Sequence, residues 1–458
     1  MERPRRRHIS TRTALWAAAA LLLLTLTVLY LPGLVAQTPP SAAAAPTVKH
    51  IIVLIADGCG YNHIAATDYY LAGRTGVLLQ EQFPVRYAMS TYPAGSGYDP
   101  QQAWADFGYV RGGATDSAAA ATALSTGCKT KNGMLGVDAD GHEVTHAMEV
   151  AERRGLSSGV VTSVPFAHAT PAGFVVHLAS RAEPPAAEAM LYDSAADVVI
   201  GAGHPYYDGD ARRRKTPQFA HISPDTWRKV QAGVPGRDAN GDGTPDRWTF
   251  VDDTNKLRAL GSSAAPKRLF GLVRVADTLQ QERSGSELAP PGVVPPTPGV
   301  PSLAELAAAA LNVLDDNPRG FMLMVEGGAV DWAAHGHQPG RLIEEVIAFS
   351  GAVEEVCRWV ERESNWDETL VIVTGDHETG YIVGPGSDPV WQPLGNNGAG
   401  WMPAVTFQST GHTNSLIPLF ARGAAAQQLA AYADEEDPVR GKYLDNTEVA
   451  KAIIALLQ

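Results

Sequence analysis

His50-Ile51-Ile52-Val53-Leu54-Ile55-Ala56 is an apolar run that ends in Asp57-Gly58-Cys59-Gly60. Strands that are buried on both faces of a parallel sheet have continuous apolar sequence, whereas half-exposed strands alternate between apolar and polar residues. The run therefore predicts a central strand of a parallel sheet, with Asp57 at its carboxyl end.

Helical and strand-like segments alternate along much of the remaining chain. Helices are predicted at 144–154, 303–314 and 341–364, and strands at 155–163, 321–325 and 369–374. The helix at 303–314 opens with the capping box Ser302-Leu303-Ala304-Glu305. This alternation predicts an α/β fold with a mostly parallel central sheet flanked by helices.

Between residues 203 and 301 the pattern changes to polar sequence that is rich in proline and glycine. It ends in Pro290-Pro291-Gly292-Val293-Val294-Pro295-Pro296. Proline and glycine clusters of this kind interrupt regular elements. We therefore expect 203–301 to be an insertion that decorates the core and does not belong to the sheet.

Composition limits the classes of function. The chain has 458 residues, of which 45% are hydrophobic, so it can bury a large core. Its 36 basic and 49 acidic residues give a net charge of −13, which argues against nucleic acid as a specific partner. The three cysteines, Cys59, Cys128 and Cys357, support no disulfide assignment.

Residues 1–46 have the pattern of an export leader followed by a linker. The segment Arg3-Pro4-Arg5-Arg6-Arg7 is basic, residues 14–31 are apolar, and the alanines at 42–45 offer a cleavage site. We expect export to the periplasm, the extracellular space or the cell surface. The apolar run is long for a signal peptide, so an uncleaved N-terminal membrane anchor stays open as the alternative.

Acidic residues stand at the ends of the three predicted buried strands. Asp57 follows the first strand, Glu326 follows the second, and Asp376-His377 follow the third. Ligands bind at the carboxyl ends of strands in an open parallel sheet, so we expect these side chains to converge. One such carboxylate is more often a turn residue or a cap. Three together repel one another unless positive charge lies among them, and metal ions are the usual source of that charge.

Further metal ligands are predicted from helical spacing. Asp331 and His335 are four residues apart, which places both on one face of a helix as the start of a zinc site. His412, in Gly411-His412-Thr413-Asn414, is the best candidate for a third ligand. The other histidines considered are predicted to be structural or surface residues: His142, His146, His177, His204 and His337.

Ser117 is the candidate nucleophile. It lies in Gly112-Gly113-Ala114-Thr115-Asp116-Ser117 and is followed by four alanines. Glycines and an Asp-Ser pair before strong helix formers predict a turn that leads into a helix N-terminus. Free N–H groups there attract anions, which suits a hydroxyl that receives phosphate. A capped, alanine-rich core helix is the alternative.

Two more polar residues lie in one segment. Thr170, in His168-Ala169-Thr170-Pro171, can offer a hard oxygen to magnesium, and Arg181 has the planar donor fork that matches two phosphate oxygens. Each residue by itself is typical of a protein surface.

Together these residues resemble the alkaline phosphatase family. The resemblance runs from about residue 49 to the C-terminus, is interrupted by the insertion, and predicts one catalytic domain over 47–458. It rests on five motifs in order: the strand ending at Asp57, Thr115-Asp116-Ser117-Ala118-Ala119, His168-Ala169-Thr170-Pro171 with Arg181, Glu326-Gly327-Gly328-Ala329-Val330-Asp331 with His335, and Thr374-Gly375-Asp376-His377-Glu378-Thr379-Gly380 with Gly411-His412-Thr413.

The resemblance implies hydrolysis of small phosphate monoesters to an alcohol and inorganic phosphate through a phosphoserine on Ser117, with Arg181 as the substrate clamp. It implies two zinc ions and one magnesium ion. The ligand sets are Asp331, His335 and His412 for one zinc, Asp57, Ser117, Asp376 and His377 for the other, and Asp57, Thr170 and Glu326 for magnesium. Two metal ions about 4 Å apart can stabilise both the attacking and the leaving oxygen.

Three positions depart from the best-known bacterial pattern. His168 stands where an aspartate precedes the magnesium-binding threonine, and Trp332 stands where a lysine follows the first zinc-binding aspartate. A neutral imidazole favours zinc or cobalt over magnesium, so His168 is a candidate ligand that makes the third metal open. Ala114 replaces a branched residue, which we interpret as packing.

Other functions remain alternatives. A sulfatase of the same superfamily needs x-Pro-x-Arg after its nucleophile, but alanines follow Ser117. A metal-dependent phosphodiesterase typically lacks the third metal site that Glu326 and Thr170 imply. A non-catalytic phosphate- or metal-binding protein is the third alternative. The sequence leaves open whether the protein is a homodimer.

The insertion contains a candidate calcium loop. Asp238, Asn240, Asp242 and Asp246 occupy positions 1, 3, 5 and 9 of a pattern with Gly243 at position 6, as at the front of an EF-hand loop. Position 12 is Thr249, so the usual bidentate glutamate is missing. A plain turn is the alternative to Ca²⁺ binding.

Overall fold

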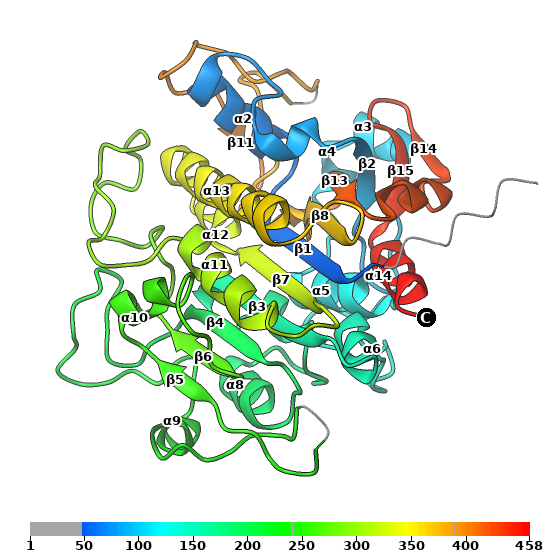
Figure 1. Cartoon of the computed structure of the whole chain (residues 1–458). Coiled ribbons are helices and arrows are strands. Elements are labelled where there is room, and N and C mark those ends of the chain that lie inside the picture. The colour runs from blue at the N-terminus through cyan, green and yellow to red at the C-terminus, as the bar shows by residue number, and fades with distance from the viewer. Residues whose placement is uncertain (1–47, 240–241, 389) are drawn as a thin grey trace, which may run out of the picture. The chain divides into compact units, whose positions relative to one another are not determined.

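The computed structural model describes residues 48–239, 242–388 and 390–458. Within these residues the central sheet has 11 strands, in the order β14-β15-β2-β13-β8-β1-β7-β3-β4-β6-β5 (Figure 1). Strands β1, β3, β4, β5, β6, β7 and β8 run parallel to one another, whereas β13 is antiparallel to both β8 and β2. The predicted α/β fold with a mostly parallel sheet is confirmed.

The bounds of the strands are β1 (His50–Ala56), β2 (Val85–Ser90), β3 (Ser157–Pro165), β4 (Val198–Ala202), β5 (Thr249–Val251), β6 (Leu269–Leu272), β7 (Phe321–Gly327), β8 (Thr369–Gly375), β9 (Glu378–Thr379), β10 (Ile382–Val383), β11 (Thr406–Phe407), β12 (His412–Thr413), β13 (Ile417–Gly423), β14 (Glu435–Asp437) and β15 (Gly441–Asp445).

The bounds of the helices are α2 (Tyr61–Ala72), α3 (Pro100–Ala105), α4 (Phe107–Val110), α5 (Ser117–Thr126), α6 (Ala147–Arg153), α7 (Ala169–Ala172), α8 (Glu183–Tyr192), α9 (Pro224–Gln231), α10 (Thr254–Ala259), α11 (Leu303–Leu314), α12 (Ala329–His335), α13 (Pro339–Glu363) and α14 (Asn446–Leu456), with short 3₁₀ helices η1 (Leu79–Gln82) and η2 (Ala426–Ala431).

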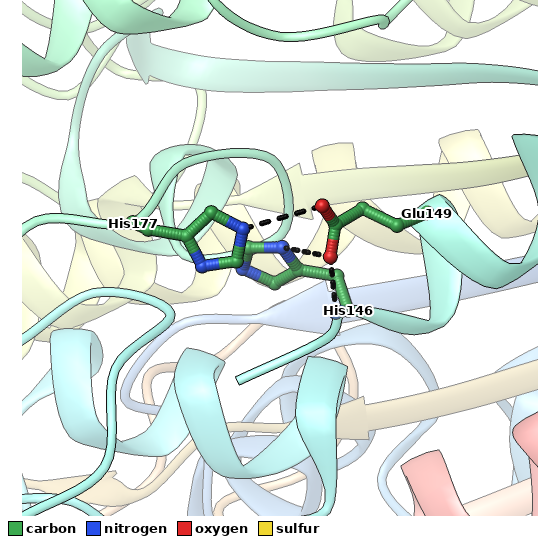
Figure 2. Close-up of side chains that lie close together, drawn as sticks. All are labelled: His146, Glu149 and His177. Carbon is green, nitrogen blue, oxygen red and sulfur yellow. Dashed lines mark hydrogen bonds and ion pairs between the residues drawn. The ribbon is translucent and has the colours of Figure 1, made fainter. Parts of the chain in front are cut away.

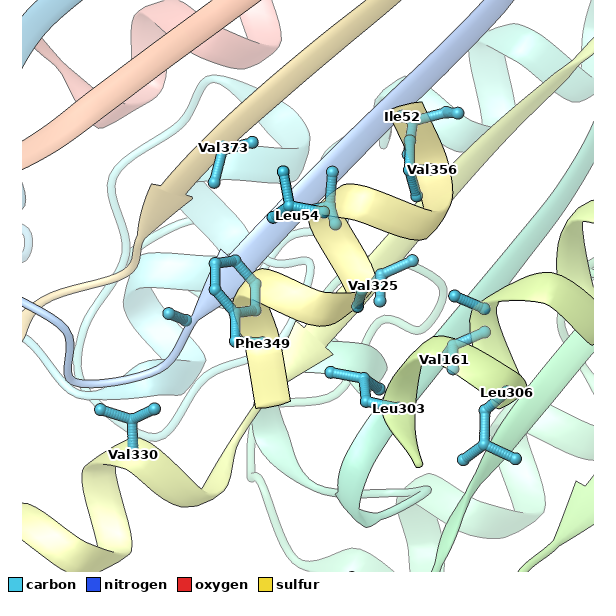
Figure 3. Packing of buried hydrophobic residues seen from close by; sticks show 14 of the residues in the cluster. Ile52, Leu54, Val161, Leu303, Leu306, Val325, Val330, Phe349, Val356 and Val373 are labelled. Atoms are coloured by element: carbon cyan, nitrogen blue, oxygen red, sulfur yellow. The ribbon is translucent and has the colours of Figure 1, made fainter. Parts of the chain in front are cut away.

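Strand β1 lies at the centre and is buried along its whole length. Its even-numbered side chains, Ile52 and Leu54, face the side of the sheet that α11 and α13 cover, where they belong to one core with Leu306 and Phe349 (Figure 3). Its odd-numbered residues, such as Val53, face a second core on the other side, which includes residues of α5, α6, α8 and α14. The continuous apolar run is thus explained by helices on both faces.

The predicted helices and strands are present with small shifts at their ends. The predicted strand at 321–325 extends to Gly327, so Glu326 lies within β7 and not after it. The predicted helix at 341–364 begins at Pro339 and ends at Glu363. Proline is favourable in the first turn of a helix because no intrahelical N–H bond is lost there.

The prediction that 203–301 lies outside the sheet is wrong for two short segments. Strand β6 pairs with β4, and β5 pairs with β6 at the edge of the sheet. Leu269, Phe270 and Leu272 of β6 are fully buried, so this short apolar run completes the sheet although polar sequence surrounds it. Tertiary burial here outweighs the local composition.

In the part of the chain that the structure describes, every helix is too short or too polar to cross a membrane. The predicted leader at 1–46 lies outside the described residues.

Candidate active site

Three strand ends bring acidic side chains together. Strand β1 pairs in parallel with β7 on one side and with β8 on the other, and Ala56 is aligned with both Gly327 and Gly375. This register places Asp57, Glu326 and Asp376 at the same edge of the sheet. All three side chains are fully buried. The convergence predicted from the sequence is present.

Asp57, Asp376 and His377 form the first group of possible metal ligands. His377 Nε2 lies 3.2 Å from Asp376 Oδ2 and 3.5 Å from Asp57 Oδ1. It also lies 3.3 Å from Ser117 Oγ. Asp376 Oδ1 accepts hydrogen bonds from the backbone N–H of Gly58 and of His377, which orient the carboxylate. The nucleophile candidate therefore lies beside this group.

Asp331, His335 and His412 form the second group. His335 Nε2 lies 3.3 Å from Asp331 Oδ2, and His412 Nε2 lies 3.6 Å from Asp331 Oδ1. The two imidazole Nε2 atoms are 3.1 Å apart. The Nδ1 atoms of His335 and His412 lie 2.6 and 2.8 Å from the carbonyl oxygens of Thr410 and Thr115.

The tautomers follow from these carbonyl contacts. A carbonyl oxygen only accepts, so each Nδ1 carries the proton and donates it. The two Nε2 atoms then face each other, and their lone pairs repel unless a proton or a cation lies between them. A metal ion satisfies both nitrogens and the Asp331 carboxylate at once, and a second-shell carbonyl on Nδ1 is the usual partner of a metal-bound histidine. This donor set fits zinc.

Asp57, His168 and Glu326 form the third group. Glu326 accepts a hydrogen bond from Thr162, and Thr170 in α7 is fully buried. The described residues provide no hydrogen-bond partner for Glu326 Oε1, His168 Nδ1 or either carboxylate oxygen of Asp57. Buried polar atoms without partners are rare and mark a place where an ion or water belongs.

The electrostatics of these groups also require positive charge. Burial raises the pKa of Glu326 to about 7 and that of Asp376 to about 6, with Asp331 and other nearby carboxylates adding to the effect. The pKa of Asp57 is raised well above its ordinary value by burial and by Asp376, Asp331 and Glu326. Without metal ions, the ionised form of these carboxylates is unfavourable. Bound cations would make the ionised form favourable.

His168 is a neutral ligand candidate. Burial lowers its pKa to about 4, and the charge of Arg181 acts in the same direction. The imidazole is therefore neutral at neutral pH, with one N–H and one nitrogen lone pair, and it can bind a metal ion through the nitrogen that carries no proton.

Ser117 is the first residue of α5, at the N-terminus that the sequence predicts. Asp116 is the N-cap, since its Oδ1 accepts the Ala119 N–H at 2.9 Å. Its Oδ2 lies 3.0 Å from Arg181 Nη1, and Arg181 Nη2 lies 3.2 Å from His168 Nε2. Arg181 is thus held beside Ser117 with its charged fork toward the metal-ligand groups.

A cavity of about 460 Å³ opens onto the site. Its lining includes Ser117, His168, Arg181, Asp331, Trp332, His335 and His412, and also Gln281, Glu282 and Gln338. Gln281 Nε2 donates to Gln338 Oε1 at 2.8 Å, and its own Oε1 is buried without a partner. Sequence reasoning missed these residues because Gln281 and Glu282 lie in the polar 203–301 segment and no motif marks them.

Two other sequence predictions concern residues outside this site. The Asp238 carboxylate accepts the backbone N–H groups of Asp242 and Gly243, and Asp246 accepts the N–H of Ala239, as in a turn. Asn240 lies outside the described residues, so calcium binding stays a prediction. His337 Nε2 donates to the backbone carbonyl oxygen of Ser409 at 2.8 Å, and the His337 ring stacks on Phe407.

The chain resembles known proteins over most of its length. The family model for alkaline phosphatase matches residues 48–400. Alkaline phosphatase of Escherichia fergusonii is 29% identical over 85% of this chain and 84% of its own. The streptomycin-6-phosphate phosphatase of Streptomyces griseus is 29% identical over 93% of this chain and 95% of its own.

Solved structures show the same fold. The cold-active alkaline phosphatase of a psychrophilic Shewanella species superposes with a TM-score of 0.64 at 24% identity, over 89% of this chain and 100% of that one. A variant of TAB5 alkaline phosphatase, in which a histidine is replaced by aspartate, superposes with a TM-score of 0.61 at 23% identity, over 90% of this chain and 99% of that one; it holds magnesium in its M3 site. The family match spans most of the chain and covers the five sequence motifs, except for His412 in the fifth. It places this chain in the alkaline phosphatase family.

Proposed function

We propose that this phosphatase hydrolyses phosphate monoesters through a phosphoserine on Ser117, at a site that takes two zinc ions and a third metal ion. The observation that carries the proposal is the pair of Nε2 atoms of His335 and His412, 3.1 Å apart, beside buried carboxylates that lack partners. One cation would satisfy both nitrogens and the Asp331 carboxylate at once, whereas a proton between the two nitrogens would leave the buried carboxylates without a partner.

The three groups divide the metal ions among them. Asp331, His335 and His412 would hold one zinc, and Asp57, Asp376 and His377 would hold the second beside Ser117 Oγ. Asp57, Glu326, Thr170 and His168 would hold the third ion. When bound, the metal ions act as Lewis acids that lower the pKa of the serine hydroxyl and offset the negative charge of the phosphoryl group.

The side chains of the chain itself supply binding and orientation. The Arg181 guanidinium can donate two parallel hydrogen bonds to phosphate oxygens, and Asp116 holds it in place from the other side. The free N–H groups at the start of α5 add positive potential at the same point. Ser117 Oγ attacks phosphorus and the alcohol leaves; water then cleaves the phosphoserine and releases inorganic phosphate.

His168 decides the identity of the third ion in this proposal. An imidazole ligand favours zinc or cobalt, and a carboxylate favours magnesium. The TAB5 variant that gained an aspartate in place of histidine and holds magnesium in its M3 site agrees with this reasoning. We expect His168→Asp to shift metal-dependent activation toward magnesium, as measured by activity after dialysis against each metal.

The cavity wall favours a polar leaving group. Gln281, Glu282 and Gln338 line the cavity with amide and carboxylate groups, which can hydrogen-bond to polar groups of a substrate. We expect Gln281→Ala to raise KM for sugar or cyclitol phosphates more than for p-nitrophenyl phosphate. If KM changed equally for both classes of substrate, this wall of the cavity would have no role in specificity.

One assay tests the proposed reaction against its alternatives. The protein is expected to release phosphate from p-nitrophenyl phosphate, to lose this activity with a chelator, and to act poorly on bis(p-nitrophenyl) phosphate. Preference for the diester would favour the phosphodiesterase. Absence of turnover from both esters, with zinc and magnesium supplied, would favour a binding protein.

The assignments outside the site remain part of the proposal. Residues 1–46 serve as an export leader or anchor, and 47–458 form the catalytic domain, in which 203–301 supplies β5 and β6 to the sheet and Gln281 and Glu282 to the active-site cavity. N-terminal sequencing of the exported protein would test the leader.

A further inference from the structure

A second group of ligand-type side chains lies away from the active site. His146, Glu149 and His177 each offer an atom within 4.8 Å of the others. We call these three residues the α6 cluster, because His146 caps α6 and Glu149 lies in its first turn. Figure 2 shows both imidazole rings directed toward the Glu149 carboxylate. From the sequence, both histidines are predicted to be structural or surface residues.

The contacts of His177 determine its tautomer. Its Nδ1 lies 2.7 Å from the carbonyl oxygen of Gly136, so Nδ1 carries a proton and donates it. Its Nε2 points at Glu149 Oε1, 3.3 Å away. This nitrogen either carries a second proton, which makes an ion pair with Glu149, or presents its lone pair to a cation.

His146 distinguishes the cluster from a simple ion pair. Its side chain is fully buried, its Nε2 has no hydrogen-bond partner among the described residues, and its Nδ1 makes only a long contact of 3.5 Å with Glu149 Oε2. Leaving a buried polar atom without a partner is unfavourable, because the atom loses its hydrogen bonds to water. An ion pair between Glu149 and His177 would be complete without this second imidazole, so His146 remains unexplained by it.

The spacing of the three side chains suits a transition metal. Two ligands of a tetrahedral zinc ion lie about 3.3 Å apart, because zinc–nitrogen and zinc–oxygen bonds are about 2.0–2.1 Å long. In the α6 cluster His177 Nε2 is 3.3 Å from Glu149 Oε1, and His146 Nδ1 is 3.5 Å from Glu149 Oε2. Two imidazoles and one carboxylate are a common zinc ligand set.

The surroundings leave room for a fourth ligand. A cavity of about 810 Å³ is lined by Glu149 and His177 and by the exposed Glu143. Water can therefore reach the cluster and complete the coordination of a metal ion. The buried side of the cluster is fixed, since the backbone N–H of His146 donates to Glu149 Oε2 at 2.8 Å.

We propose that His146, Glu149 and His177 bind one further divalent transition-metal ion of the zinc type, separate from the active site. The ion ties the start of α6 to the segment that contains His177 and leads to Arg181. Its role is structural: it fixes these two segments and takes no part in phosphate chemistry.

Zinc content tests this site. The holoenzyme is dialysed against a buffered free Zn²⁺ concentration with Mg²⁺ present, and zinc per chain is counted by mass spectrometry. His146→Gln and His177→Gln should each hold about one zinc ion less than the wild type while they keep phosphatase activity. The matched control is His204→Gln, because His204 is also buried and faces one carboxylate, Asp252, but has no second imidazole in its group.

Two further measurements keep the proposal open to refutation if a histidine variant fails to fold. Glu149→Gln retains a side chain that can cap α6 but loses the charge that binds zinc, and it too should lose about one zinc ion. In wild-type crystals, anomalous diffraction at the zinc edge should give a peak between His146 Nδ1 and His177 Nε2. No peak there at a zinc concentration that fills the active site, or unchanged zinc content in the folded variants, would overturn the proposal.

Discussion

The active site and the α6 cluster both gather histidines and carboxylates, but they differ in charge. The active site holds four buried carboxylates, those of Asp57, Glu326, Asp331 and Asp376. The α6 cluster holds only Glu149. One proton on His177 can balance Glu149, whereas protons on the active-site carboxylates would remove the negative charge that binds the metal ions.

The difference in charge predicts that the active site binds its metal ions more tightly than the α6 cluster does, although both sites consist of histidines and carboxylates. Several ionised carboxylates around a site raise the affinity for divalent cations, and their repulsion makes the metal-free protein less stable. The α6 cluster has a protonated alternative and should exchange its metal more easily. Buried histidines alone therefore do not identify a catalytic centre, and our proposal that the centre lies beside Ser117 rests on the surplus of carboxylates there.

The largest effect is expected for Ser117→Ala. Removing the hydroxyl abolishes the covalent route, so turnover should fall by about 10⁴-fold or more. The ligands Asp57, Asp376 and His377 are untouched, so the zinc content of both sites should stay at the wild-type value. Steady-state kinetics and metal analysis check this; a variant that turns over at the wild-type rate would remove Ser117 from the mechanism.

Stepwise metal removal should separate the two sites. A weak chelator is expected to take the ion of the α6 cluster first and to leave activity unchanged. A stronger chelator should then lower turnover by about a thousandfold, since metal ions contribute several kcal/mol to charge stabilisation. Activity and bound zinc are measured in the same samples. If activity falls with the first zinc lost, the assignment of strong and weak sites is wrong.

Arg181→Ala should weaken the handling of phosphate and leave the metals bound. A charged bidentate contact is worth about 1.5–3 kcal/mol, so kcat/KM should fall by about 10- to 100-fold. KM should rise and inhibition by inorganic phosphate should weaken, because the clamp acts on bound substrate as well as on the transition state. Inhibition by phosphate that equals the wild-type value would contradict the role of Arg181.

The smallest expected effect is the change in the stability of the metal-free protein with pH. The pKa of Glu326 is raised to about 7 and that of Asp376 to about 6 in the folded state, chiefly by burial. The folded state thus binds more protons than the unfolded state between about pH 4 and pH 7. This stabilisation is present below the unfolded pKa values and is lost as the pH rises through 6 to 7.

Relative to Glu326→Gln, the metal-free wild type should therefore lose unfolding free energy between pH 5 and pH 8, on the order of 2 kcal/mol. The metal-loaded protein should not show this decline, because bound cations favour the ionised carboxylates. Calorimetry of both forms across this range measures it, and Glu326→Gln should flatten the decline. A metal-free wild type whose stability relative to Glu326→Gln does not fall toward pH 8 would contradict the electrostatic account.

Much of the active site could be predicted because its residues are marked by local features. A carboxylate at the end of a buried strand, a pair spaced by four on a helix and a serine at a helix start are all visible in short segments. Asp57, Asp331 with His335, and Ser117 are examples, and the parallel register of β1, β7 and β8 brings them together.

What could not be predicted depends on contacts between distant segments. Gln281 lines the active-site cavity only because the 203–301 segment folds back onto it, and β6 enters the sheet through pairing with β4. His146 and His177 look like ordinary structural histidines until the fold places both against Glu149. Such contacts cannot be predicted from the periodicity or the spacing of residues in the sequence.

The most direct test of the central claim is to trap the covalent intermediate. The wild-type enzyme is mixed with p-nitrophenyl phosphate, quenched with acid during turnover, digested and analysed by mass spectrometry, with Ser117→Ala as the control. The account predicts phosphate on the peptide that contains Ser117, on that residue alone, and none in the variant. Phosphate on a different residue, or continued turnover with no phosphorylated peptide under conditions that preserve phosphoserine, would contradict it.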